Sequence, residues 1–377
     1  MKKVLTTIAA VCAISGCAKF SASVPESEQN QPISFQAQNY VSSTKAGDAD
    51  NGGHLEFTAE SFWVRAVYTG AASWADAYLE DAVTYMNNVE VKKNNGVWAP
   101  AKDYYWPKAG KLTFIGWTPN VMVEFSTYQS SFLTLGPYTV KSDDLMLSDP
   151  AIDKSIEDAD DITHFAPGVP MLFHHLLAKV NFKAKVKENM DSDGITHHIV
   201  LNSVIVRSIV HTGTYYVDAT DSNLSGSWDA GIDYEDEDSN PDYYYTNNVD
   251  LQSIGSTYAS VDSELTTTAT DPLFPKDLYV MPQTLANSSI VELQYVIYYC
   301  NSKGKILDRY VITAATGQED ASQFKLKDFT KDGTPLTKWE QNKIYYYTIV
   351  FDPNSKKITF DPAVINWSSV NADPKEI

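Results

Sequence analysis

Residues 179–187 read KVNFKAKVK, and this stretch decides the fold class of the chain. Its apolar side chains, Val180, Phe182, Ala184 and Val186, occupy every second position, and lysine fills all but one of the positions between and around them. Successive side chains of a β-strand point to opposite faces of the sheet, whereas a helix would scatter the two sets around its surface. The alternation therefore predicts a strand with one buried face and one solvent-facing face.

Other segments extend this prediction along the chain. The sequence holds 23 Tyr, 15 Phe and 8 Trp, and these residue types favour the half-buried surface of a sheet. Strands are predicted at Leu112–Trp117, Ile199–Val210, Ile290–Tyr299 and Lys305–Thr313, and a hairpin at Ile344–Phe351 and Lys357–Phe360. Short helices are expected at Ser73–Met86 and near Glu319–Leu326. The fold class is therefore all-β, with antiparallel sheets and few short helices.

The first 17 residues have the features of an export signal. Lys2 and Lys3 precede an apolar run, Val4–Ile14, which is too short to span a bilayer. The run leads into ISGC at residues 14–17, which resembles the lipobox of bacterial lipoproteins. That resemblance implies a signal peptide at 1–16 and an acylated Cys17 as the mature N-terminus. The alternative is an ordinary secretory signal cut near Gly16, with Cys17 unmodified.

Charge and cysteine content narrow the functional class. The formal net charge is −19, so the surface is expected to repel nucleic acid and anionic lipid headgroups. Cys12 lies in the signal and Cys17 is the lipid site, which leaves Cys300 without a partner for an internal disulfide. Cys300 lies in the apolar run Val296–Cys300, so we expect a buried packing residue and not a nucleophile.

A short strand signal stands apart from the rest near the N-terminus. Residues 18–32 are polar, and then Ile33, Phe35 and Ala37 alternate with polar residues ahead of a Ser/Gly/Asp-rich break at 42–53. An isolated strand is not stable, so this leader strand must pair with a sheet. Lys45 lies in the break, where a protease can reach the chain. Cutting between Lys45 and Ala46 would release the strand and expose a sheet edge.

No pattern of catalytic or metal-binding residues stands out. The pairs His174-His175 and His197-His198 would each place at most one imidazole on a given face of a strand, so surface or strand-end histidines are expected. The acidic residues at 233–242 lack the spacing of a calcium loop. Tyr243–Tyr245 could stack on sugars, but core packing is the preferred interpretation. We therefore predict no enzyme activity, no metal and no cofactor.

Several short motifs, in order along the chain, resemble the fimbrillins, which comprise the type V pilins and related Mfa-like lipoproteins of the Bacteroidia. Each motif alone is weak, but their shared order over about residues 33–367 makes coincidence improbable. The motifs are Tyr105-Trp106-Pro107 with Leu112–Pro119, Asp144-Leu145-Met146, Phe173–Phe182, Gly213-Thr214-Tyr215, Met281-Pro282-Gln283, and Trp339 with Lys343, Tyr345 and Tyr347.

The resemblance implies two tandem transthyretin-like β-sandwich domains in a subunit of a cell-surface pilus (fimbrium). It implies export as an outer-membrane lipoprotein, cleavage after a basic residue, and polymerisation with other pilin subunits by strand exchange. The best-known cleavage in the family follows Arg, whereas this chain offers Lys45. The expected division is a signal at 1–16, a lipidated leader at 17–45, and domains at 46–168 and 169–377.

Two questions stay open at this point. The tail residues Val364, Ile365 and Trp367 are a candidate donor strand, but they could equally form the last strand of their own domain. The main alternative function is a monomeric surface lipoprotein that binds a glycan or a host protein.

Overall fold

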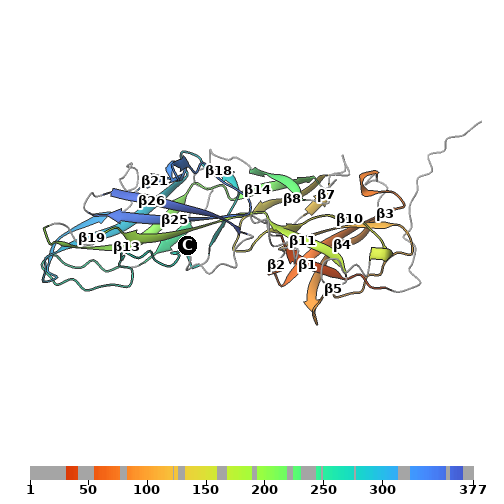
Figure 1. Ribbon diagram of the computed structural model, residues 1–377, viewed down its shortest axis with the longest axis horizontal. Coiled ribbons are helices and arrows are strands. Elements are labelled where there is room, and N and C mark those ends of the chain that lie inside the picture. Colours follow the sequence, from red (N-terminus) through yellow and green to blue (C-terminus); the bar gives the residue numbers. More distant parts are fainter. Residues whose placement is uncertain are drawn as a thin grey trace, which may run out of the picture.

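The computed structural model is an elongated all-β molecule, with the early strands at one end and the late strands at the other (Figure 1). It describes residues 31–40, 55–76, 83–121, 123–125, 132–158, 168–188, 193–218, 224–230, 243–247, 249–275, 277–312, 323–353 and 357–367. The all-β prediction is confirmed. Helical structure in the described part consists of three 3-10 turns, η1 (Trp74–Asp76), η2 (Ile156–Asp158) and η3 (Leu326–Asp328). None of the helices in these ranges could cross a membrane.

The early strands form a sheet that closes on itself. Within the described ranges it has nine strands, in the order β10-β6-β3-β4-β5-β1-β11-β9, with β2 paired to β1. Since β9 pairs with β6 as well as with β11, the order returns to β6 and makes a ring. The strands are β1 (Phe35–Asn39), β2 (Leu55–Glu56), β3 (Ser61–Gly70), β4 (Val83–Asn94), β5 (Val97–Pro100), β6 (Lys111–Thr118), β9 (Met146–Ser148), β10 (Ala151–Lys154) and β11 (Val169–His175).

The late strands form a β-sandwich around a second core. One sheet has the order β17-β12-β25-β26 and the other β16-β13-β19-β20, with β21 paired to β19. The first comprises β12 (Ala178–Val186), β17 (Leu278–Val280), β25 (Lys343–Asp352) and β26 (Lys357–Asn366). The second comprises β13 (Thr196–Arg207), β16 (Tyr243–Thr246), β19 (Ile290–Cys300), β20 (Ile306–Ile312) and β21 (Gln323–Lys325).

A third sheet joins strands from both parts of the chain. Its order is β15-β14-β8-β7, formed by β7 (Val123–Phe125), β8 (Phe132–Thr139), β14 (Thr212–Asp218) and β15 (Ser225–Ala230). A core beneath it combines Ile115 and Trp117 of β6 with Ile344 of β25 and with Trp367. Two short pairs complete the described strands, β18 (Gln283–Thr284) with β24 (Lys338–Trp339) and β22 (Thr330–Lys331) with β23 (Thr334–Pro335).

The alternating stretch at 179–187 behaves as predicted on its apolar face. Val180, Phe182, Ala184 and Val186 are buried in the sandwich core. Asn181, on the opposite face, is also buried, which the alternation did not predict. Its Nδ2 donates to the carbonyl oxygen of Phe274 at 3.2 Å and to Asp277 Oδ1 at 3.0 Å, so the loop around Phe274 covers it.

Three features differ from the sequence-based expectations. The helix expected over Ser73–Met86 is wrong at its end, because residues 83–86 belong to β4, and the helix expected near Glu319–Leu326 is wrong at 323–325, which form β21. Pairing with β3 and β19 outweighs the weak local helix propensity there. The sheets are not purely antiparallel, since β1–β11 and β12–β25 are parallel. Residues 77–82 and 319–322 lie outside the described ranges.

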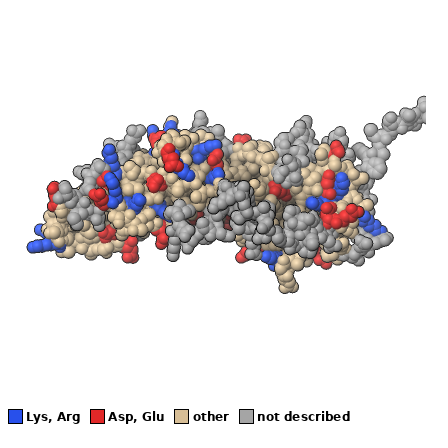
Figure 2. All heavy atoms as spheres, viewed as in Figure 1, with Lys and Arg blue, Asp and Glu red and all other residues tan. Residues whose placement is uncertain are grey.

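The charged side chains of either sign are interspersed on the face shown in Figure 2. The described residues of this face therefore do not gather into one broad basic patch. Cys300 is fully buried beside Tyr298 and Ile306, and burial raises the pKa of its thiol. The predicted packing role of Cys300 is confirmed.

Buried tyrosines predict a loss of stability in alkali. Burial raises the pKa of Tyr138, Tyr243, Tyr345 and Tyr346 to about 12, from an ordinary value of 10.0. The unfolded chain therefore loses these protons at lower pH than the folded chain. The contribution of these tyrosines to the free energy of unfolding is fully present below pH 10 and is lost as the pH rises through 12. Urea unfolding at stepped pH, followed with tyrosinate absorbance, checks this. A free energy of unfolding that stays constant from pH 10 to beyond pH 12 would contradict it.

Candidate functional site

The leader strand β1 lies inside the ring of early strands, bonded on both edges. It pairs in parallel with β11 over five residue pairs, from Phe35 opposite Val169 to Asn39 opposite Phe173. Its other edge is covered in pieces, by β5, by β2 and by the backbone at 104–106. There the Ile33 N–H donates to the Tyr104 carbonyl oxygen at 2.7 Å. The prediction that this strand must pair with a sheet is confirmed.

The apolar side chains of the leader strand fill the first core. Ile33 and Phe35 are each 2% exposed and Ala37 is 8% exposed. The Phe35 ring meets the rings of Phe62 and Phe114 edge-on, with centroid distances of 5.7 Å in both cases. Removal of β1 would therefore leave a slot lined by aromatic rings and flanked by the free edge of β11.

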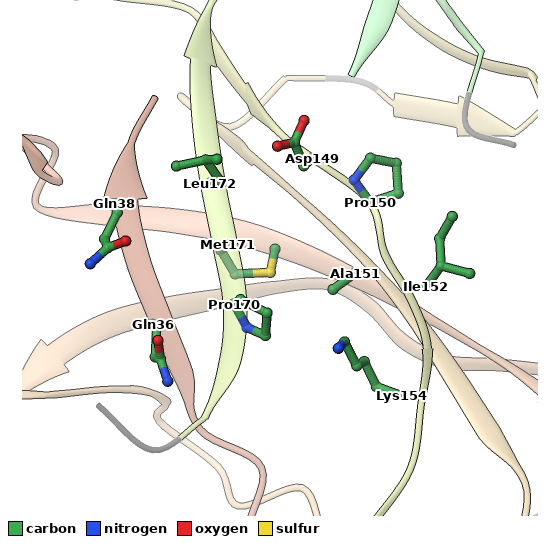
Figure 3. Close-up of a pocket in the computed structure, with 10 residues that line it drawn as sticks. All are labelled: Gln36, Gln38, Asp149, Pro150, Ala151, Ile152, Lys154, Pro170, Met171 and Leu172. Atoms are coloured by element: carbon green, nitrogen blue, oxygen red, sulfur yellow. The ribbon is translucent and has the colours of Figure 1, made fainter. Parts of the chain in front are cut away.

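The outward side of β1 borders a cavity of about 280 Å3 (Figure 3). Gln36 and Gln38 of β1 lie along one side, and the segment Asp149–Lys154 lies along the other. Met171 of β11 and Ala151 of β10 face each other across its floor. The strand is thus lined by a cavity on one face and by the packed core on the other.

Tyrosines beside the slot help to fix the segment that covers the second edge of β1. The hydroxyl of Tyr85, on β4, donates to the carbonyl oxygen of Tyr105. Burial, together with the neighbouring Tyr104, raises the pKa of Tyr85, so the hydroxyl stays protonated as a donor. Residues 104–106 are thereby tied to the ring independently of β1.

The end of the leader strand rests on the paired histidines of β11. The Tyr40 ring stacks on His174 with a centroid distance of 4.3 Å, and His174 Nε2 lies 2.9 Å from Asp149 Oδ1. His175 Nδ1 lies 2.7 Å from Asp144 Oδ2, and its ring stacks on Trp367 at 4.1 Å. The two histidines therefore link the end of β1 on one side and the tail of the chain on the other.

At Gly168 the chain passes close to the backbone of the leader strand. Its φ is +130°, and a Cβ there would lie 2.9 Å from backbone atoms of Ser34 and Phe35. We expect Gly168→Ala to destabilise the protein more than Gly194→Ala, where φ is +75° and nothing lies within 4 Å of the added Cβ. The control carries only the conformational cost of about 1–2 kcal/mol. Chemical denaturation of both variants measures the difference, and equal losses would contradict a close approach.

The predicted site residues are placed unequally. Cys17, Lys45 and Ala46 lie outside the described ranges, as do residues 233–242. Val364 and Ile365 are half-buried on β26, and Trp367 is buried. Because β26 pairs with β25 over ten residue pairs, Val364 and Ile365 lie in the last described strand of their own sandwich, and Trp367 follows directly after that strand.

The remaining candidate residues, His198 and the tyrosines at 243–245, make structural contacts. His198 Nδ1 lies 2.6 Å from Glu264 Oε1, and its ring stacks on Tyr258. Among the described residues, no group of three His, Cys, Asp or Glu side chains could hold a metal ion. Tyr243 and Tyr245 pack against the sandwich core, whereas Tyr244 is 58% exposed. The tyrosines therefore do not form one aromatic surface.

The main partner of the leader strand was not predicted from the sequence. Val169, Met171, Phe173 and His175 are buried at every second position of β11. The sequence carries no matching alternation, because Met171, Leu172 and Phe173 are all apolar and two histidines follow them. The parallel pairing of β11 with a strand more than a hundred residues earlier had no local signal.

Comparisons with known proteins agree with this architecture. A model of a family described as fimbrillin-like matches residues 44–367. A fimbrial protein from Bacteroides vulgatus, known from its crystal structure, is 15% identical, with a TM-score of 0.56, over 89% of this chain and 99% of the other. At that identity the likeness shows a shared fold. No curated protein matches the chain.

Two further crystal structures are more distant. A proposed cell adhesion protein from Bacteroides uniformis is 13% identical, with a TM-score of 0.42, over 91% of this chain and 100% of the other. A second, from Parabacteroides distasonis, is also 13% identical, with a TM-score of 0.43, over 91% and 99%.

Proposed function

The chain belongs to the fimbrillin-like family, and from that membership we propose that it is a pilus subunit that polymerises by strand exchange. In this proposal Cys17 carries the lipid that holds the exported precursor at the outer membrane. A protease cuts after Lys45 and frees the leader strand. A strand from a neighbouring subunit then takes its place beside β11. The protein is structural and adhesive, and has no catalytic role.

One observation carries the proposal, namely that β1 is a core strand placed ahead of the expected cleavage segment. Ile33 and Phe35 are each 2% exposed, yet the chain between Tyr40 and Leu55 holds the proposed cut at Lys45. Burying each of the two large side chains contributes about 1.5–3 kcal/mol. A subunit that has lost this strand is expected to bind a replacement, because the slot offers both apolar contacts and unpaired backbone groups.

We further propose that the chain forms two domains, with the division after β11. The strand β11 begins at Val169 but pairs with β1 and β9 of the ring, and β12 begins the sandwich at Ala178. Residues 176–177 are therefore a better division than the one expected between 168 and 169.

The tail remains the candidate donor strand. Among the described residues β26 has a partner on one edge only, and Val364 and Ile365 are half-buried. Its release would break ten residue pairs with β25 and the stacking of Trp367 on His175. The replacement strand in the slot must therefore compensate for these lost contacts.

The protein isolated from cells tests the proposal. An N-terminus at Ala46, with ladders on unboiled gels, is expected for the assembled subunit. The Lys45→Gln variant should keep a longer N-terminus and run as a single band. An N-terminus at Cys17 without ladders would refute processing and support a lipid-anchored monomer.

A further inference from the structure

A cleft of about 880 Å3 lies beside the third core, lined by residues from both parts of the chain. Glu60, Trp63 and Asp143 line it from the early part, and Lys179 and Tyr279 from the late part. Clefts of this size hold small ligands in many proteins. The cleft is separate from the cavity beside β1 that faces Met171.

Lys179 supplies hydrogen-bond donors that the surrounding protein leaves unused. Its Nζ lies 4.1 Å from the centre of the Trp367 ring and 5.4 Å from that of Tyr279. Within the described part of the chain it has no ion pair or hydrogen bond, although the carboxylates of Asp144 and Asp277 are near enough to favour its charged form; Oδ2 of Asp144 lies 2.7 Å from His175 Nδ1. Burial lowers the pKa of Lys179. A ligand oxygen placed here would satisfy a desolvated ammonium.

Acceptors and apolar surface line the same cleft. Glu60 and Asp143 are exposed carboxylates, each able to accept hydrogen bonds from a ligand. Trp63 and Tyr279 are half-buried and so present part of each ring to the cleft. Donors, acceptors and ring surface together match a ligand whose polar hydroxyls alternate with C–H faces.

We propose that this cleft binds a short neutral oligosaccharide. Hydroxyl groups both donate and accept hydrogen bonds, so one sugar can accept from the ammonium of Lys179 and donate to the carboxylate of Asp143 at once. Its C–H face would lie against Trp63. Acidic sugars are disfavoured, because Glu60, Asp143 and Asp144 outnumber the single lysine in the lining.

Binding of a sugar in this cleft does not require strand exchange. It is tested on the uncut full chain, because Asn39 of β1 forms part of the cleft wall. The probes are lactose, N-acetyllactosamine, maltotriose and N,N′-diacetylchitobiose, measured by saturation-transfer NMR and calorimetry. At least one should bind saturably, and sialylation of N-acetyllactosamine should weaken any binding at least tenfold. Failure of all four probes, or tighter binding of the sialylated form, would overturn the proposal and leave ladder formation unaffected.

Three variants assign binding to the cleft. Lys179→Met keeps the apolar stem over the two rings and should lose at least tenfold in affinity. Asp143→Asn, at an exposed position, should weaken binding several-fold without changing thermal stability. Tyr244→Ala is the matched control, because Tyr244 is 58% exposed and lies outside the cleft. Unchanged binding by both cleft variants, or loss of binding by the Tyr244 variant, would place the sugar elsewhere.

Discussion

Replacing Phe35 by alanine is expected to lower the free energy of unfolding of the uncut chain by about 3–5 kcal/mol. The Phe35 ring is 2% exposed and lies between Phe62 and Phe114, so its removal leaves a cavity that rigid aromatic neighbours cannot fill. Urea denaturation measures the change.

Gln38→Ala is the matched control for this prediction. Gln38 lies on the same strand but borders the cavity beside β1, and its side chain is half-exposed. Its loss should cost less than 1 kcal/mol, about the range of a surface substitution. Similar losses for both variants would mean that the leader contributes only backbone pairing, and the slot would then have little power to select a donor strand.

Cutting the folded chain after Lys45 is expected to turn the leader into an exchangeable ligand. Trypsin can make this cut, and mass spectrometry identifies it. After cleavage the strand is held by its pairing with β11 and by its buried side chains, so it should stay bound. A labelled peptide of residues 31–45 should then enter the slot as the original strand leaves.

Peptide variants test what the slot recognises. A peptide with Phe35→Asp should bind at least 100-fold more weakly, because each 1.4 kcal/mol is a factor of ten and a buried carboxylate adds a desolvation cost. A peptide of residues 357–377 tests the tail as donor. If the leader leaves without loss of thermal stability and no peptide binds, the strand-exchange proposal fails.

Much of the strand content could be predicted from local sequence. The expected strands at Leu112–Trp117, Ile290–Tyr299 and Ile344–Phe351 correspond to β6, β19 and β25. The predicted hairpin is present, since β25 and β26 pair antiparallel. These predictions succeed because side-chain alternation is a local property that reflects which face of a strand is buried.

Local sequence was less informative about the candidate site. The leader signal at Ile33, Phe35 and Ala37 predicted a docked strand, but not its position between β11 and β5. In the sequence, the adjacent histidines at 174–175 had to be considered as metal ligands. In the fold their rings stack on Tyr40 and Trp367. The cleft at Lys179 had no sequence signal, because its walls come from segments far apart in the chain.

The sequence by itself determined that this chain is all-β, that it resembles the fimbrillins, and that an apolar strand signal precedes Lys45, the expected cleavage position. Only the tertiary structure decided which strands are neighbours, and therefore that the leader is a core member of a closed ring. The physical reason is that alternation specifies the buried face of a strand, whereas its partner is chosen by register and by packing against residues distant in sequence.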